Sequence, residues 1–302
     1  MKWQKKGIVF SPQGQFDWVI THGMCPTAER IHGDIFRVYF SGRDYLNRSL
    51  IGYIDFDINK PEKILSISEK PVLGLGELGT FDDNGVTPMW IINHNNKKYL
   101  YYVGWNQGST VRMAEMSGLA VSTDGGETFS RVSRAPILNR TNREPFSILC
   151  APCIMKDGKE WKMWYVSGEE WVHKDLIKYN IKYAYSKDGI NWERDGHVCI
   201  GFTDDEYAFA RPCVLKENGL YNMWYSFKKG QDDYRYKMGY AESVDGLEWV
   251  RKDNEVDLVP SKDGWDSEMV TYPFVFNHNG KKYMLYNGNW YGKTGFGLAV
   301  KD

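Results

Sequence analysis

The sequence lacks any apolar run long enough for a membrane span, and its first residues do not form a secretory signal. Histidine is scarce, with six residues in 302, and no dense metal-ligand motif occurs. The 38 Lys and Arg residues balance 39 Asp and Glu, so no basic excess indicates nucleic-acid binding. These absences predict a cytoplasmic protein with no membrane span, no nucleic-acid partner and no His/Cys-type metal site.

Cysteine is also sparse. Five residues, an odd number, fit reduced thiols better than a disulfide framework. The spacing of Cys150-Ala-Pro-Cys153 is typical of redox or metal motifs, but no second pair accompanies it. We interpret these cysteines as core residues.

Aromatic residues, in contrast, are abundant, with 12 Trp and 20 Tyr. They are typical both of sugar-binding clefts and of β-sheet cores. A length of 302 residues is compatible with one all-β domain, so we expect residues 1–302 to form a single domain.

A short motif that ends in proline recurs five times along the chain. Its prolines are separated by 62, 64, 60 and 61 residues. The motifs are Met24-Cys-Pro26, Val86-Thr-Pro88, Cys150-Ala-Pro152, Ala210-Arg-Pro212 and Thr271-Tyr-Pro273. A period of about sixty residues indicates five similar modules.

Each module reads as four short strands. After the proline come an apolar run, a Gly/Asn/Asp turn and an aromatic strand such as Met163-Trp-Tyr-Val166, the pattern of a hairpin. A third strand follows, and in three modules it runs into a Ser-x-Asp-Gly turn and a fourth strand, as at Ser186-Lys-Asp-Gly189. Four strands repeated radially predict an all-β, five-bladed β-propeller.

The last module ends after its third strand, and the N-terminus supplies the missing fourth strand. Trp3-Gln-Lys-Lys-Gly-Ile-Val-Phe10 has the form of the outer strand that begins at Trp192. We therefore expect residues 1–12 to close the ring and Trp3 to be structural, because closure removes an open sheet edge.

Polar residues just before each proline motif are expected to converge at one mouth of the central channel. They are His22, Asp82, Asp83, Glu144, Asp205, Glu206, Arg211, Asp266 and Glu268. Glycosyl transfer generally needs one protonated and one ionised carboxyl group. The predicted catalytic residues are Asp83, Glu144, Glu206 and Glu268, with His22, Arg211 and Asp266 binding substrate; the alternative is that each acid is a solvated loop carboxylate.

A second ring of candidates follows the second strands. Trp105 and Trp171 are predicted to stack on sugars, Asn106 to bind hydroxyls, and Arg43, with Asp44 beside it, to hold an anion. Alternatively, the tryptophans shield the core and Arg43 pairs with Asp44.

The five-module pattern resembles the five-bladed glycosidases of glycoside hydrolase families 43, 32 and 130. It is still more similar to uncharacterised bacterial proteins found with surface-polysaccharide biosynthesis genes. The shared motifs are Phe40-Ser-Gly-Arg-Asp44, Met163-Trp-Tyr-Val-Ser-Gly168, Ala210-Arg-Pro-Cys213 and Gly264-Trp-Asp-Ser-Glu-Met269. The resemblance covers all five modules.

Families 43 and 32 imply a base or nucleophile in blade one, a positioning aspartate in blade two and an acid in blade three. Asp83 and Glu144 match the last two, but blade one has His22-Gly-Met-Cys-Pro26, with no carboxylate beside the proline. Family 130 implies one aspartate and a phosphate held by basic side chains. His22, Arg43 and Arg211 suit such an anion site.

The leading prediction is an enzyme that cleaves or transfers a glycosyl unit of a sugar, glycan or nucleotide-sugar. Its subtype stays open between a glycosidase, a phosphorylase and a glycosyltransferase. The alternative is a non-catalytic carbohydrate-binding or scaffold propeller. We expect no cofactor and no catalytic metal, with a structural Ca²⁺ or Na⁺ on the axis left open; the sequence predicts no oligomeric state.

Overall fold

A computed structural model describes residues 2–230 and 233–301. The regular secondary structure of the described chain is almost entirely β-strand, with one four-residue α-helix, α1 (Asn289–Gly292), and one 3-10 helix (Asp253–Glu255). The predicted all-β class is confirmed. Neither of these helices is long and apolar enough to cross a membrane.

Among the described residues, the strands pair antiparallel in five sets of four, each named here by its first inner strand. The β2 set contains β2 (Thr21–His32), β3 (Ile35–Arg43), β4 (Ser49–Asp57) and β5 (Ile64–Ile67). The β6 set contains β6 (Gly85–His94), β7 (Lys97–Gln107), β8 (Met113–Ser122) and β9 (Ser130–Arg131). The β10 set contains β10 (Ile148–Asp157), β11 (Glu160–His173), β12 (Leu176–Ser186) and β13 (Val198–Ile200). The β14 set contains β14 (Glu206–Glu217), β15 (Leu220–Lys229), β16 (Lys237–Ser243) and β17 (Val250–Arg251).

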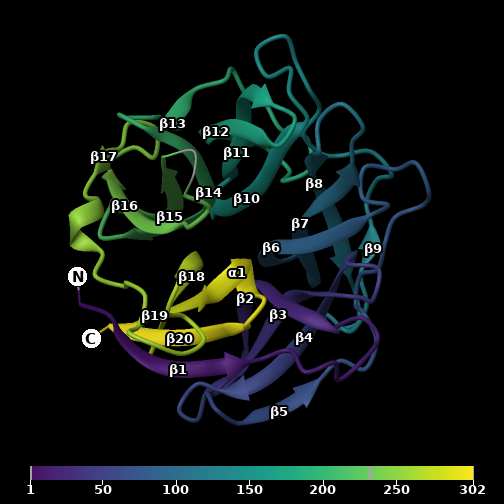
Figure 1. Ribbon diagram of the computed structural model, residues 1–302, viewed down its shortest axis with the longest axis vertical. Helices are drawn as coiled ribbons and strands as arrows, with labels where there is room; N and C mark the ends of the chain where they lie inside the picture. Colours follow the sequence, from purple (N-terminus) through teal and green to yellow (C-terminus); the bar gives the residue numbers. More distant parts are fainter. Residues whose placement is uncertain (1, 231–232, 302) are drawn as a thin grey trace.

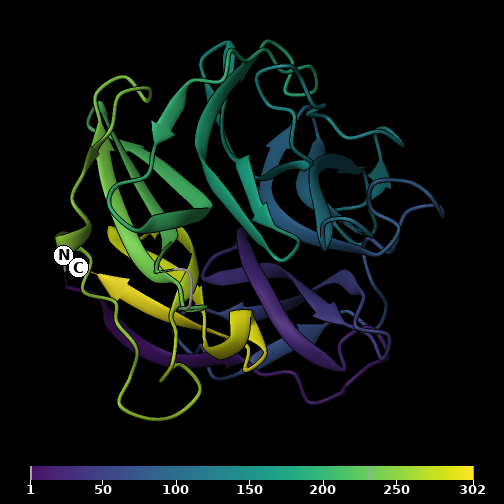
Figure 2. The ribbon, with the colours of Figure 1, turned by 45° about the horizontal axis from the view of Figure 1, so that its top comes forward.

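The fifth set, the β18 set, is assembled from both ends of the chain. It contains β18 (Thr271–His278), β19 (Lys281–Asn287), β20 (Phe296–Lys301) and β1 (Gln4–Phe10). Gln4 of β1 lies opposite Val300 of β20, which brings the two ends of the described chain side by side (Figure 2). Trp3 is 6% exposed and packs edge-on against Trp224, with 6.5 Å between ring centroids.

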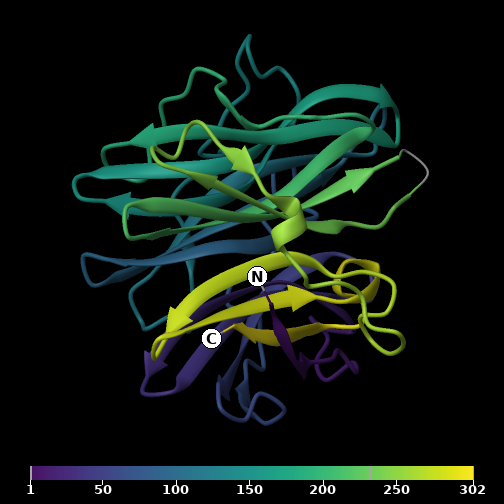
Figure 3. The ribbon, with the colours of Figure 1, turned by 90° about the vertical axis from the view of Figure 1, so that its left-hand side faces the viewer.

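The sets are arranged around a common centre (Figure 1), and the edge view shows the β18 set beside the β14 set (Figure 3). Apolar clusters fill the spaces between neighbouring sets, because each sheet has an apolar face to bury. Trp90 of β6 packs against four of these clusters, so it lies near the centre. Asn287 of β19 bonds to the backbone of Gly23 and Cys25, joining the β18 set to β2.

The proline motifs form a bulge at the start of the inner strands. The residue before the proline has a positive φ at Cys25 (52°), Ala151 (50°), Arg211 (48°) and Tyr272 (56°), and the strand pairing shifts register there. Thr87 holds the same place in β6 and is not among the positive-φ residues. A β-branched residue is the type least tolerant of that conformation. Bulges re-aim side chains, and these four residues line the central cavity.

Candidate functional site

A funnel lies where the inner strands begin. Its mouth has a volume of about 350 Å³, and a narrower chamber of about 70 Å³ lies beneath it. The mouth is within the size range of small-molecule pockets, roughly 300–1,000 Å³. The two spaces share the residues Met24, Trp105, Met113, Glu115, Tyr179, Tyr236 and Tyr272.

Contacts between neighbouring sets position the walls of the funnel. Glu115, near the start of β8, lies opposite Ile148 of the next set in a short parallel pairing. Its backbone N–H donates a hydrogen bond of 2.8 Å to the carbonyl oxygen of Ser147. Tyr179 of β12 lies opposite Ala208 of β14 in the same way. The funnel side chains are therefore held by the rigid junctions between sets rather than by free loops.

Glu115 is the carboxyl group shared by the mouth and the chamber. Burial raises its pKa to about 7, although the hydrogen bond from the Cys150 thiol and the charge of Arg112 act in the opposite direction. The Cys150 Sγ lies 3.3 Å from the Glu115 Oε2. A carboxyl group that titrates near neutral pH both donates and accepts protons readily, which is what general acid–base catalysis requires.

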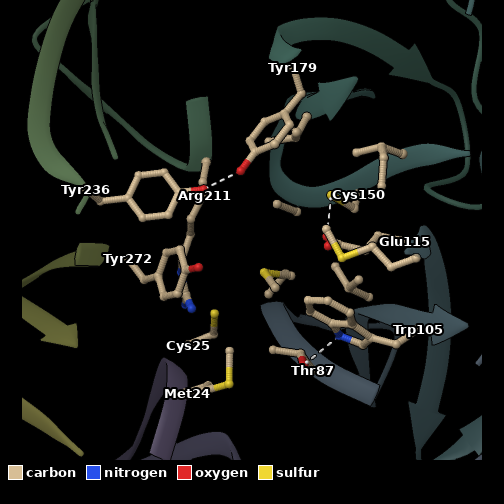
Figure 4. A pocket seen from close by; sticks show the side chains of 17 residues that line it. Met24, Cys25, Thr87, Trp105, Glu115, Cys150, Tyr179, Arg211, Tyr236 and Tyr272 are labelled. Carbon is tan, nitrogen blue, oxygen red and sulfur yellow. Dashed lines mark hydrogen bonds between the residues drawn. The ribbon is translucent and has the colours of Figure 1, made fainter. Parts of the chain in front are cut away.

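Tyrosines form the wall opposite Glu115. Figure 4 shows Tyr179, Tyr236 and Tyr272 facing the side that carries Glu115 and Trp105. The hydroxyl groups of Tyr179 and Tyr236 are hydrogen-bonded to each other. The Trp105 Nε1 donates to the Thr87 Oγ1 at 3.1 Å, which fixes the indole ring. Aromatic faces with polar edges suit the apolar faces and hydroxyl groups of a sugar.

Three cationic side chains line the mouth: Arg43, Arg112 and Lys228. The Lys228 Nζ lies 3.0 Å from the Tyr291 hydroxyl and 4.4 Å from the centre of the Tyr236 ring. Burial, together with the charge of Arg112, lowers the pKa of Lys228 to about 8. The Nε of Arg43 is buried without a hydrogen-bond partner, and among the described ion pairs none of the three cations meets a carboxylate. Two carboxyl groups, Glu115 and Asp175, also line the mouth, but the three cations outnumber them, so the mouth favours an anionic ligand.

Comparison with known proteins gives both close and distant relatives. No family model matches the chain. It is 43% identical over 306 residues to the uncharacterized protein MT1551 of Mycobacterium tuberculosis strain CDC 1551, and 42% identical to the uncharacterized protein Rv1502 of strain H37Rv. Both alignments cover 100% of each partner. This chain belongs to the same family as these two mycobacterial proteins.

More distant likeness is found among solved structures. A structure named as a glycoside hydrolase has a TM-score of 0.79 at 19% identity and covers 99% of this chain and 91% of its own. A GH130-family structure has a TM-score of 0.73 at 15% identity, covering 100% and 94%. A thermostable family-43 glycoside hydrolase has 0.68 at 18% identity, covering 93% and 89%. The family thus shares a propeller-like fold with glycoside hydrolases.

Two of the predicted catalytic acids lie in a recurring buried ion pair. In four sets an acid at or just ahead of the start of the inner strand meets a cation near or on the outer strand, with nitrogen–oxygen distances of 2.5–2.7 Å. The pairs are Asp82–Arg131, Glu144–Arg194, Glu206–Arg251 and Asp266–Lys5. In the β2 set, the buried Trp18 lies in the corresponding segment. None of the four carboxylates is among the described residues that line the funnel.

Further contacts hold these carboxylates in place. Tyrosine hydroxyls donate to Asp82 at 2.8 Å, to Glu144 at 2.7 Å and to Asp266 at 3.1 Å. Burial raises the pKa of Glu206, but the hydrogen bonds from Arg251 outweigh it and bring the pKa below its ordinary value. Such buried, ion-paired carboxylates favour a structural interpretation of Glu144, Glu206 and Asp266.

The other two predicted acids also lie away from the funnel walls. Asp83 accepts hydrogen bonds from the side chain of Asn106, on β7, at 2.5 Å and from the backbone of Gly79, in its own loop, at 2.8 Å. Glu268 is exposed and accepts a hydrogen bond from the Tyr234 hydroxyl at 2.8 Å. The structure therefore brings no pair of the four predicted acids together in the funnel.

The predicted binding residues divide into two groups. Arg43, Trp105 and Arg211 line the funnel, and Arg43 is not paired with Asp44, which instead binds Arg48 at 2.7 Å. Outside the described lining lie His22, Asp44, Asn106, Trp171 and Asp266. Burial, with the charges of Arg43 and Lys293, lowers the pKa of His22 to about 3, so it is neutral near pH 7.

Glu115, Lys228, Arg112 and the tyrosines were not predicted from the sequence. A signal for three of them exists: Glu115, Tyr179 and Tyr236 each stand three residues before the third-strand position marked by Gly118, Lys182 and Gly239. This third ring repeats with the modules. Its side chains reach the funnel because the third strand of one set pairs with the first strand of the next.

Proposed function

We propose that this protein is a carbohydrate-active enzyme that cleaves or transfers a glycosyl unit, with Glu115 as its general acid–base. The observation that carries the proposal is a carboxyl group with a pKa of about 7 in a funnel lined by tyrosines and cations. The likeness to glycoside hydrolases supports the same class of chemistry.

The charge of the mouth favours a phosphate-bearing reactant. Arg43, Arg112 and Lys228 suit the phosphate of an attacking phosphate ion, a sugar phosphate or a nucleotide-sugar. Protonated Glu115 gives its proton to the leaving oxygen as the bond from that oxygen to the anomeric carbon breaks. An oxygen of the acceptor then bonds to the anomeric carbon, and its proton returns to Glu115. A phosphorylase or glycosyltransferase therefore fits better than the two-acid hydrolase.

We further propose that the five sets are the blades of one propeller domain spanning residues 1–302, with β1 closing the ring. Lys5 of β1 supports this, because it pairs with Asp266 as Arg131, Arg194 and Arg251 pair with the acids of their own sets. We propose a cytoplasmic role in surface-polysaccharide or glycan metabolism. We also propose function without a metal, since the positive charge of Arg211 opposes a Ca²⁺ or Na⁺ in the chamber.

The test is a turnover screen with purified protein on sugar phosphates, nucleotide-sugars, and aryl glycosides with and without phosphate. We expect Glu115→Gln to lose at least about 100-fold in turnover, because general acid–base catalysis contributes on the order of 10²–10⁴-fold. Asp83→Asn and Glu268→Gln are the matched controls, and both should keep wild-type turnover. If a substrate is turned over equally by Glu115→Gln, the assignment of Glu115 is wrong.

The competing function, a carbohydrate-binding or scaffold propeller, is tested by the same screen. It predicts that a sugar raises the melting temperature of the wild type and of Glu115→Gln alike, with no product from either. That outcome would replace the enzyme proposal.

A further inference from the structure

Arg211 lies at the chamber wall with an incomplete set of partners. Arg211 is only 3% exposed. Its Nη2 donates hydrogen bonds to the carbonyl oxygen of Pro26 at 2.7 Å and to the Thr27 Oγ1 at 2.9 Å. The Nη1 is buried with no hydrogen-bond partner. Among the described ion pairs, Arg211 meets no carboxylate, in contrast to Arg131, Arg194 and Arg251.

A buried, unpaired guanidinium group is unfavourable because its charge and its donors have left water without full replacement. The Phe274 ring, whose centre lies 5.8 Å from the guanidinium carbon, offers only partial compensation. Glu115 lines the same chamber but receives its hydrogen bond from Cys150. Arg211 lies in the bulge before the proline with a φ of 48°, as Cys25, Ala151 and Tyr272 do in their own sets.

The chamber is otherwise lined largely by apolar side chains, among them Met89, Ile148 and Ala151. Its volume of about 70 Å³ suits a small charged group or a few waters. Figure 4 shows Arg211 running behind Tyr272, and its end lies beside Cys25. Both Nη2 hydrogens of Arg211 are in use, so its free Nη1 can donate to one oxygen of a small carboxylate in the chamber, whereas a bulkier phosphate matches the wider cationic mouth.

We propose that the chamber binds the carboxylate of an acidic sugar of the uronic acid class, with Arg211 as its counter-ion and the sugar ring extending toward the aromatic mouth. This inference rests on the proposed function and names the class of sugar that the funnel takes. A carboxylate at Arg211 also places a negative charge in the chamber of Glu115, which favours the protonated, proton-donating form of Glu115.

The test compares ligands of matched shape on the wild-type protein by thermal shift and calorimetry. Sodium glucuronate, at about ten times its dissociation constant, should raise the melting temperature by about 2 °C, whereas glucose should not. Calorimetry near pH 7 in buffers of different ionisation enthalpy should show proton uptake when glucuronate binds, because the pKa of Glu115 rises. Equal shifts with glucose and glucuronate would overturn the proposal.

Two variants locate the site. Arg211→Met should lose the glucuronate shift, and Arg43→Met, in the mouth, should keep it. An unchanged glucuronate shift in Arg211→Met would overturn the assignment. If Arg211→Met does not fold, retention of the glucuronate shift in Arg43→Met, together with the wild-type comparison of glucuronate and glucose, still tests the proposal.

A third ligand, sodium formate, separates a free anion from a sugar carboxylate. A shift with formate that glucuronate does not exceed would mean that the chamber holds a small free anion, and would overturn the choice of an acidic sugar. All these readouts are binding measurements, so failure of the Glu115→Gln turnover test would leave them interpretable.

Discussion

At the scale of single residues, environment rather than residue type separates the acids of this protein. Glu115 and Glu144 are chemically identical, but Glu144 accepts hydrogen bonds from Tyr165, Ser167 and Arg194, whereas Glu115 has a single thiol donor. Hydrogen bonds and cations favour the ionised form, and desolvation without them favours the neutral form. Glu115 is in the second situation, and its pKa is raised to about 7.

The pH dependence of activity should therefore follow Glu115. As general acid it must be protonated, so kcat/KM should fall as pH rises through about 7. Cys150→Ala removes a hydrogen-bond donor to the ionised Glu115 carboxylate. This should raise the pH at which kcat/KM falls by up to about one unit, and Cys150→Ser should return that pH to the wild-type value. The pH–rate profiles of the wild type, Cys150→Ala and Cys150→Ser check this. If kcat/KM falls at the same pH in all three proteins, that fall does not report the titration of Glu115.

The free energy of unfolding should also depend on pH through the protonation of Glu115. The pKa of Glu115 is higher in the folded protein than in the unfolded chain, so the folded state binds the extra proton between about pH 4.5 and 7. Its contribution to the free energy of unfolding is present at low pH and is lost as pH rises through this window. Glu115→Gln should remove that part of the pH dependence in denaturant titrations.

At the scale of strands, the four buried ion pairs connect the start of an inner strand to the outer strand of the same set. Asp82 is 1% exposed, and Arg131 of β9 also donates to the carbonyl oxygen of Gly74. The Ser-x-Asp-Gly turns add a second recurring device, in which Ser122, Ser186 and Ser243 each accept backbone hydrogen bonds from the turn. The ion pairs and the turns both hold the outer part of a set in place, and neither contributes side chains to the funnel lining described above.

Removal of one partner should therefore cost stability and leave chemistry intact. Arg131→Met leaves the Asp82 carboxylate buried and unpaired, which should lower the free energy of unfolding by about 3 kcal/mol. The double variant Asp82→Asn/Arg131→Met should recover part of this loss, because no charge remains buried. Chemical denaturation measures both; a single variant as stable as the wild type would show that the pair is not structural.

At the scale of the whole molecule, the N-terminal strand completes the last set. Deletion of residues 1–10 removes β1, Trp3 and Lys5 together, exposes the edge of β20 and leaves Asp266 without its cation. Each of these losses is destabilising, and an open edge also invites aggregation. We expect the truncated chain not to fold.

A permuted chain is the matched control for this deletion. Gln4 lies opposite Val300, so residues 1–12 moved behind residue 302 through a short turn can form a hairpin with β20. We expect this permutant to fold with a circular dichroism spectrum and melting temperature close to those of the wild type. A folded deletion variant, or an unfolded permutant, would contradict the role of β1 in completing the β18 set.

The sequence by itself determined the repeating strand sets and the place of β1, because a sixty-residue period, turn residues and outer-strand aromatics are all local patterns. It also placed Arg43, Trp105 and Arg211 among the candidates, because they stand in or next to those patterns, and all three line the funnel. Glu115, Lys228 and the tyrosine wall were decided by the tertiary structure. Whether a side chain faces the funnel depends on the bulge at each inner strand and on the junction between one set and the next. Burial at that junction then raises the pKa of Glu115 to about 7.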